Sequence, residues 1–258
     1  MKTTVAFFGA LAGVAGVAGL YFGLGIGWIS LAIVVGVTLV GYIVAHLTAT
    51  TGFGEFMRGL LIGFNAGLNG FLGAAVYAWL LGPAGVAVGG ILGVLNFLAV
   101  FPVFSRSEVF QGFLGWLCLF QPMAYLVAGL GLLFYLTNLL LHPVALITGT
   151  KFLRVLGLRV DWKTGTFFQR GGLCSNLNPA HTAYNMGNFS FVDQSTTIWP
   201  IEHEAGHTLN LATFGSLFHL FGAFDEIVIG TGADDLAERL AESNNPSTAQ
   251  GNIIAMWI

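Results

Sequence analysis

Two histidines and a glutamate lie within five consecutive residues, in the order His203-Glu204-Ala205-Gly206-His207. Residues four apart share one face of a helix, so His203 and His207 would present both imidazoles to a single metal ion. Glu204 lies beside them, where its carboxylate could take a proton from water that the metal activates. The spacing therefore predicts a catalytic Zn2+ site, with the two histidines as ligands and Glu204 as the general base.

Such a site needs a third protein ligand, because catalytic zinc is held by three side chains and keeps one position open. Glu238 lies in the segment 234–243, which has the pattern of a capped amphipathic helix. Glu226 lies in the segment 224–229, which we expect to be a turn or a short strand. We therefore favour Glu238 as the third ligand and keep Glu226 as the alternative. Asp225 and Glu226 could instead accept the second N–H of each ligating imidazole.

The run from His203 to Asn210 resembles the active-site helix of HExxH zinc metallopeptidases, and the later acidic helix resembles the gluzincin branch of that group. The segment 238–242 is similar to the ExxAD helix of membrane peptidases of the HtpX and CAAX-protease type, although Glu242 stands where they carry aspartate. The spacing of Glu226 resembles another gluzincin pattern. The resemblance covers about residues 188–243 and implies peptide-bond hydrolysis. It also implies that a strand at 188–192 offers its edge to an extended peptide, with an ordinary edge or hairpin strand as the alternative.

Most of the chain has the composition of a membrane protein. Of 258 residues, 55% are hydrophobic and only 8% are charged, whereas soluble domains have roughly 25% charged residues. Residues 1–150 carry five charges, namely Lys2, Glu55, Arg58, Arg106 and Glu108. Five stretches there approach or exceed the length of about 20 apolar residues that a spanning helix needs: 5–24, 26–47, 56–81, 84–101 and 123–141.

Pro122, the first apolar run and several glycines give further expectations for these spans. Pro122 interrupts the stretch 110–141, so we expect a shallow or re-entrant helix before the fifth span, with six spans as the alternative. The first apolar run is expected to be a retained membrane helix and not a signal peptide. Small residues at short helical spacings predict close helix packing, and they occur at Gly9 with Gly13, Gly16 with Gly19, and Gly63 with Gly67.

Two asparagines share one face of the third predicted span. Asn65 and Asn69 are four residues apart, and we expect them to form hydrogen bonds between helices, with a polar path as the alternative. No acid–base pair is expected inside the spans, which argues against a transporter.

The pattern changes near residue 150. Short β-like runs at 152–160 and 188–192 are separated by turn-forming residues, and Pro200 marks the first turn of the helix that carries the histidines. We expect a mainly α membrane protein, with a transmembrane helical domain at 1–150 and a small membrane-associated α+β metallopeptidase-like domain at 151–258. His181 and His219 are expected to be structural, and we expect Cys118 and Cys174 not to form a disulfide.

The interpretation we favour is a membrane-bound zinc metalloprotease whose partners are the lipid bilayer and a peptide or protein substrate. The alternative is a structural or assembly subunit of a larger membrane complex, with membrane-protein partners and a vestigial or structural metal site. The net charge of −3 and the absence of a basic run exclude nucleic acid as a partner. We expect an integral membrane location, such as a bacterial inner membrane. The basic residues give conflicting indications of which side holds the C-terminal domain.

Overall fold

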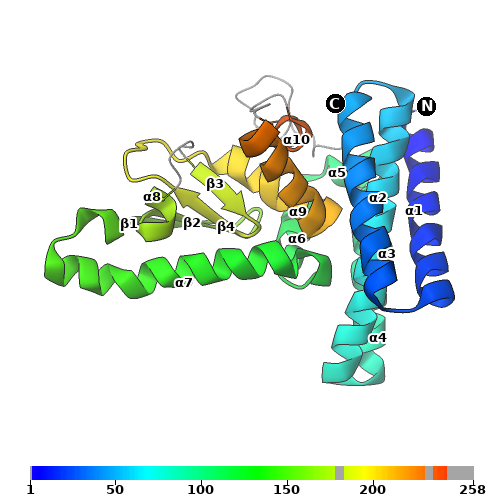
Figure 1. The fold of residues 1–258 in the computed structure, drawn as a ribbon, viewed down its shortest axis with the longest axis horizontal. Helices are drawn as coiled ribbons and strands as arrows, with labels where there is room; N and C mark the ends of the chain where they lie inside the picture. Colours follow the sequence, from blue (N-terminus) through cyan, green and yellow to red (C-terminus); the bar gives the residue numbers. More distant parts are fainter. Residues whose placement is uncertain (1, 178–182, 230–234, 243–258) are drawn as a thin grey trace.

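The computed structural model describes residues 2–177, 183–229 and 235–242. Four helices, α1 (Lys2–Leu24), α2 (Trp28–Leu47), α3 (Gly52–Leu81) and α4 (Pro83–Leu98), form a bundle at one end of the molecule (Figure 1). Two short helices, α5 (Pro102–Ser105) and α6 (Glu108–Cys118), and the 3-10 turn Pro122–Ala124 lead to the long helix α7 (Tyr125–Thr148). A second 3-10 turn (Lys151–Leu153) connects α7 to a small sheet.

In the part of the chain that the structure describes, five helical segments are long and apolar enough to cross a membrane, which is consistent with a membrane protein. Three of them are α1, α2 and α3, and the others are Pro122–Thr148 and Ile201–Ile229. The predicted span at 84–101 is not among the five, because α4 ends at Leu98 after 16 residues and Pro102 starts a new helix. The segment that carries the two histidines takes its place in the count. In Figure 1, α7 runs across the direction of α1, α2 and α3, so the five do not form one parallel bundle.

Helices α1 and α3 pack backbone to backbone. A Cβ on Gly63 would lie 2.0 Å from the carbonyl oxygen of Ala10, and one on Gly13 would lie 2.3 Å from that of Leu60. The packing role predicted for Gly9, Gly13, Gly63 and Gly67 is therefore confirmed. It is wrong for Gly16 and Gly19, around which an added Cβ would meet no described atom within 4 Å.

The first turn of α3 holds a buried ion pair that the sequence analysis did not expect. Arg58 Nη2 lies 2.8 Å from Glu55 Oε1, and both side chains are almost completely buried. Lys2 Nζ lies 3.7 Å from the same oxygen. The expectation of no acid–base pair in the spans is wrong, because α3 begins at Gly52 and so includes both residues.

The sheet has four strands in the order β1-β2-β4-β3, where β1 is Val155–Asp161, β2 Thr166–Gly171, β3 Ala183–Met186 and β4 Phe189–Val192. β2 and β4 are parallel, and the outer pairs are antiparallel. Strands at 152–160 and 188–192 were predicted and are present as β1 and β4. The prediction that 188–192 forms a free edge is wrong, because β4 is paired on both sides and the edge strands are β1 and β3. The alternative of a hairpin strand agrees with the structure, since β4 pairs antiparallel with the preceding strand β3.

Helix α9 (Ile201–Phe224) lies on the sheet and joins it to the helical bundle. It begins directly after Pro200, as predicted, and continues as a short π-helix, Asp225–Ile229. The expected turn or strand at 224–229 is therefore wrong. One hydrophobic core contains residues of the bundle, of α6, and of α9 and α10 (Leu236–Glu242), including Leu61, Leu114, Leu209 and Leu240. One core thus joins the segments before and after the expected boundary at residue 150, and it fixes α9 against the helical bundle.

Candidate metal centre

The edge hairpin of the sheet holds the first half of α9 in place. The side-chain amide of Asn185, on β3, donates to the backbone carbonyl of Glu204 at 2.9 Å and to Thr208 Oγ1 at 3.1 Å. The Thr208 hydroxyl in turn donates to the carbonyl of Gly187 in the hairpin loop, with a separation of 2.6 Å. These buried contacts fix both the position and the rotation of the helix segment that carries His203 and His207.

Helix α10 supplies the third side chain and lies close to α9. A Cβ on Gly206 would lie 2.7 Å from the carbonyl oxygen of Ala241, so glycine between the two histidines permits this close approach. The Asn210 side-chain amide donates to the Ala237 carbonyl at 3.0 Å and ties the helices together. Asp235 caps α10, because its Oδ1 accepts the backbone N–H of Glu238 at 2.8 Å.

The three nitrogen and oxygen donors converge. His203 Nε2 and His207 Nε2 are 3.2 Å apart. Glu238 Oε2 lies 3.3 Å from His203 Nε2, and Glu238 Oε1 lies 3.0 Å from His207 Nε2. Two ligands at zinc–donor distances of about 2.0–2.1 Å and a tetrahedral angle are separated by about 3.3 Å. The observed separations are close to this value, so these donors fit a zinc ion with little movement.

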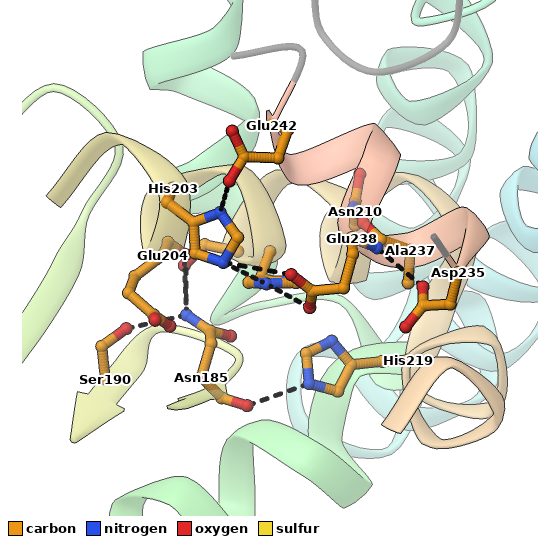
Figure 2. Close-up of polar contacts among 12 residues, drawn as sticks. Asn185, Ser190, His203, Glu204, Asn210, His219, Asp235, Ala237, Glu238 and Glu242 are labelled. Atoms are coloured by element: carbon orange, nitrogen blue, oxygen red, sulfur yellow. Dashed lines mark hydrogen bonds and ion pairs between the residues drawn. The ribbon is translucent and has the colours of Figure 1, made fainter. Parts of the chain in front are cut away.

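A second carboxylate contacts the far side of one imidazole. Glu242 Oε1 lies 2.8 Å from His203 Nδ1, so the His203 ring stands between the carboxylates of Glu242 and Glu238 (Figure 2). A metal-ligating histidine usually donates its second N–H to such an oxygen, which fixes the ring and its tautomer. Glu242 therefore has the role that the sequence analysis offered to Asp225 and Glu226.

Those two acids contact other groups. The Tyr42 hydroxyl of α2 donates to Asp225 Oδ2 at 2.9 Å, and His46 Nδ1 lies 3.6 Å from the same oxygen. Glu226 forms a group with Asp235 and Glu238. Among the described residues, the group that contains both histidines includes Glu238 and not Glu226.

Glu204 is buried with an unused oxygen. Its side chain is 3% exposed, and Oε2 has no hydrogen-bond partner within the described ranges. A buried carboxylate oxygen without a donor is costly, so a polar group is expected to bind there. Glu204 lines a cavity of about 780 Å³ together with His203, His207 and Glu238. The cavity wall also includes β3 and apolar side chains of α7, such as Val127 and Phe134.

The carboxyl groups of α10 and its cap respond differently to their surroundings. Burial alone would raise the pKa of Glu238, but hydrogen bonds and charge interactions with His203 and His207 outweigh it and hold that pKa well below its usual range. Burial raises the pKa of Asp235 to about 7, and the nearby charges of Glu238, Asp225 and Glu226 act in the same direction. Glu238 is therefore a carboxylate at neutral pH, as a metal ligand must be.

Helix α9 breaks just beyond the two histidines. Gly215 has φ of 82° and ψ of 174°, outside the helical region, and such a break leaves carbonyl groups of the preceding turn without their helical donors. Asn65 of α3 donates to the carbonyls of Ala212 and Thr213, at 3.4 and 3.0 Å, and Asn96 of α4 donates to Thr213 at 3.4 Å. The predicted interhelical role of Asn65 is confirmed.

Asn69 also links helical segments as predicted, because its amide donates to Gln121 and its oxygen accepts the Met123 N–H. His219, on the second half of α9, lines the cavity. Its Nε2 lies 3.0 Å from the backbone oxygen of Asn185, as Figure 2 shows, which fits the hydrogen-bonded structural role expected of it. His181 lies outside the described residues.

Asn185, Asn96 and the role of Gly206 were not predicted from the sequence. Asn185 lies in a strand of only four residues, too short for a periodic pattern. Asn96 and Gly206 are a polar and a small residue in apolar helices. Such a residue does not indicate from the sequence alone which other residue it contacts. Comparison with known proteins adds no candidate function: no family model, no curated protein and no solved structure matches the chain.

Proposed function

We propose that the protein is a membrane-bound zinc metallopeptidase in which His203, His207 and Glu238 hold the metal. The observation that supports this most strongly is the convergence of two imidazole nitrogens and one carboxylate at separations of 3.0–3.3 Å. Zinc prefers this mixture of nitrogen and oxygen donors. When bound, zinc would polarise a peptide carbonyl and lower the pKa of a water molecule.

Glu204 is suited to proton transfer. Its Oε2 is buried without a hydrogen-bond partner and lines the same cavity as the three donors. Low polarity around a carboxylate favours acceptance of a proton. We assign to Glu204 the removal of a proton from the attacking water and its delivery to the leaving amine. His203 and His207 are held by α9 for binding, and Glu242 orients His203.

The position of the edge strand supports a peptide substrate. β3 lines the cavity with Ala183, Tyr184, Asn185 and Met186, and within the described residues its pairing partner is β4 alone. An extended peptide can add to an exposed strand edge through main-chain hydrogen bonds. We therefore propose that the substrate peptide binds to the edge of β3, and not to the strand at 188–192 as the sequence predicted.

The number of ligands separates this proposal from a structural zinc site. Structural zinc is usually closed by four protein ligands, whereas catalytic zinc has three and an open position. In the described ranges, the group around the two histidines has three members and opens on the cavity. An assembly subunit with a closed metal site is the interpretation that this arrangement favours less.

Glu204→Gln provides the test, with Glu202→Gln as its matched control. Glu202 lies in the same helical turn but is exposed. Both variants should retain about one zinc per chain at the histidine site, whereas only Glu204→Gln should lose cleavage of a fluorogenic peptide mixture, by at least about 100-fold. Cleavage at the wild-type rate by Glu204→Gln would refute this mechanism. Absence of zinc from the wild type, or unchanged zinc after His203→Ala, would refute the metal assignment.

A further inference from the structure

Three carboxylates form a second cluster beside the proposed zinc ligands. Glu226, Asp235 and Glu238 each offer one oxygen, and these oxygens lie within 4.8 Å of one another. They come from different elements: Glu226 from the short π-helix after α9, Asp235 from the cap of α10, and Glu238 from α10 itself. Three negative charges at this separation repel one another strongly, so the cluster requires a positive charge or protons.

Asp235 is the member that points to a bound ion. Its side chain is completely buried. Oδ1 accepts the Glu238 N–H, but Oδ2 has no hydrogen-bond partner among the residues that the structure describes. In Figure 2, the Asp235 carboxylate lies on the same side of α10 as the side chains of Glu238 and of His219 from α9. A fully buried carboxylate oxygen without a donor loses its hydration, and either a proton or a cation in the adjacent space would compensate for this loss.

We propose that Glu226, Asp235 and Glu238 bind a second divalent cation, which shares the Glu238 carboxylate with the zinc ion. The two oxygens of one carboxylate can each contact a different metal ion. The ligand set consists of oxygen alone, which suits Mg²⁺, Ca²⁺ or Mn²⁺ better than zinc. The inference rests on the proposed function only through this shared residue, because Glu226 and Asp235 have no part in the zinc site.

The second ion would position the third zinc ligand. It would link the end of α9, through Glu226, to the start of α10, through Asp235, and so fix α10 against the helix that carries both histidines. It would also offset the negative charge around Glu238. Two-metal sites use such bridging carboxylates to place both ions at one reaction centre.

Mn²⁺ binding to the zinc-loaded, full-length protein in detergent tests the proposal, because electron paramagnetic resonance distinguishes free from bound Mn²⁺. The wild type should bind one Mn²⁺ per chain in addition to zinc. Asp235→Asn and Glu226→Gln should each weaken Mn²⁺ binding by at least about tenfold while zinc is retained. Asparagine still caps the helix, and retained zinc shows that each variant is folded. Glu202→Gln, the exposed control, should bind Mn²⁺ as the wild type does.

Three results would overturn the proposal: no Mn²⁺ bound beyond zinc, unchanged Mn²⁺ affinity in both Asp235→Asn and Glu226→Gln, or binding that His203→Ala abolishes and Asp235→Asn leaves intact. The last would show Mn²⁺ at the histidine site. His203→Ala should instead lose zinc and keep Mn²⁺. The test also stands if the wild type binds no zinc, since Mn²⁺ binding that depends on Asp235 and Glu226 is then measured alone.

Discussion

Glu242 Oε1 and His203 Nδ1 are 2.8 Å apart, on the side of the imidazole opposite to the nitrogen that faces Glu238. A carboxylate in this position holds the ring in the orientation that presents Nε2 to a metal and makes that nitrogen a stronger donor. The two glutamates are four residues apart on α10, so a single helical turn supplies both a ligand and the group that orients another ligand.

Glu242→Ala should therefore weaken zinc binding without abolishing it. The expected loss of affinity is about 10–100-fold, the range found when outer carboxylate partners of ligating histidines are removed. Competition with a zinc-binding dye measures it. Glu242→Asp introduces the aspartate that peptidases with an ExxAD helix carry at this position, and it should retain more zinc affinity than the alanine variant. Wild-type affinity in Glu242→Ala would show that the contact has no role in metal binding.

Glu238→Ala should lower zinc occupancy much more than Glu226→Ala. The Glu238 carboxylate contacts both imidazoles at 3.0–3.3 Å, whereas Glu226 belongs to the separate carboxylate cluster. Removing one of three protein ligands leaves a site that holds zinc poorly. Metal analysis of the purified variants after dialysis against a weak chelator checks the ranking. The opposite ranking would make Glu226 the third ligand.

The choice between these two glutamates illustrates what the sequence could supply. The i, i+4 histidines and the capped segment around Glu238 are local patterns, and local patterns predicted α9, α10 and β4. The edge position of β3, the buried pair Glu55–Arg58 and the contacts of Asn185 depend on which elements become neighbours in space. A short strand or a polar residue in an apolar helix does not carry that information.

Gly215→Ala should destabilise the protein and weaken the zinc site together. The residue has φ of 82°, where an L side chain is strained, and an added Cβ would lie 2.5 Å from Asn65 Oδ1. The strain alone costs about 1–3 kcal/mol. Gly16→Ala is the matched control, because a Cβ there meets no described atom within 4 Å and a helical position favours alanine. Thermal unfolding in detergent compares the two. Equal melting temperatures would show that the break at Gly215 tolerates a side chain.

The two cysteines should react very differently with a maleimide. Cys174 is only partly buried and lines the cavity, whereas Cys118 is completely buried. Burial raises the pKa of both thiols. A raised pKa means less thiolate at a given pH, so Cys174 should be labelled more slowly than a free peptide thiol, at a rate that rises about tenfold per pH unit between pH 6.5 and 8. Cys118 should react only after unfolding.

Mass spectrometry of Cys174→Ala and Cys118→Ala assigns the label to a residue. Because Cys174 lines the same cavity as His203 and Glu204, a peptide hydroxamate, which combines a zinc-binding group with a peptide chain, should slow its labelling when zinc is bound. The same compound should not slow labelling in His203→Ala, which lacks a metal ligand. Fast labelling of native Cys118 would contradict the burial described for α6, and protection that persists in His203→Ala would show that the compound binds independently of the metal.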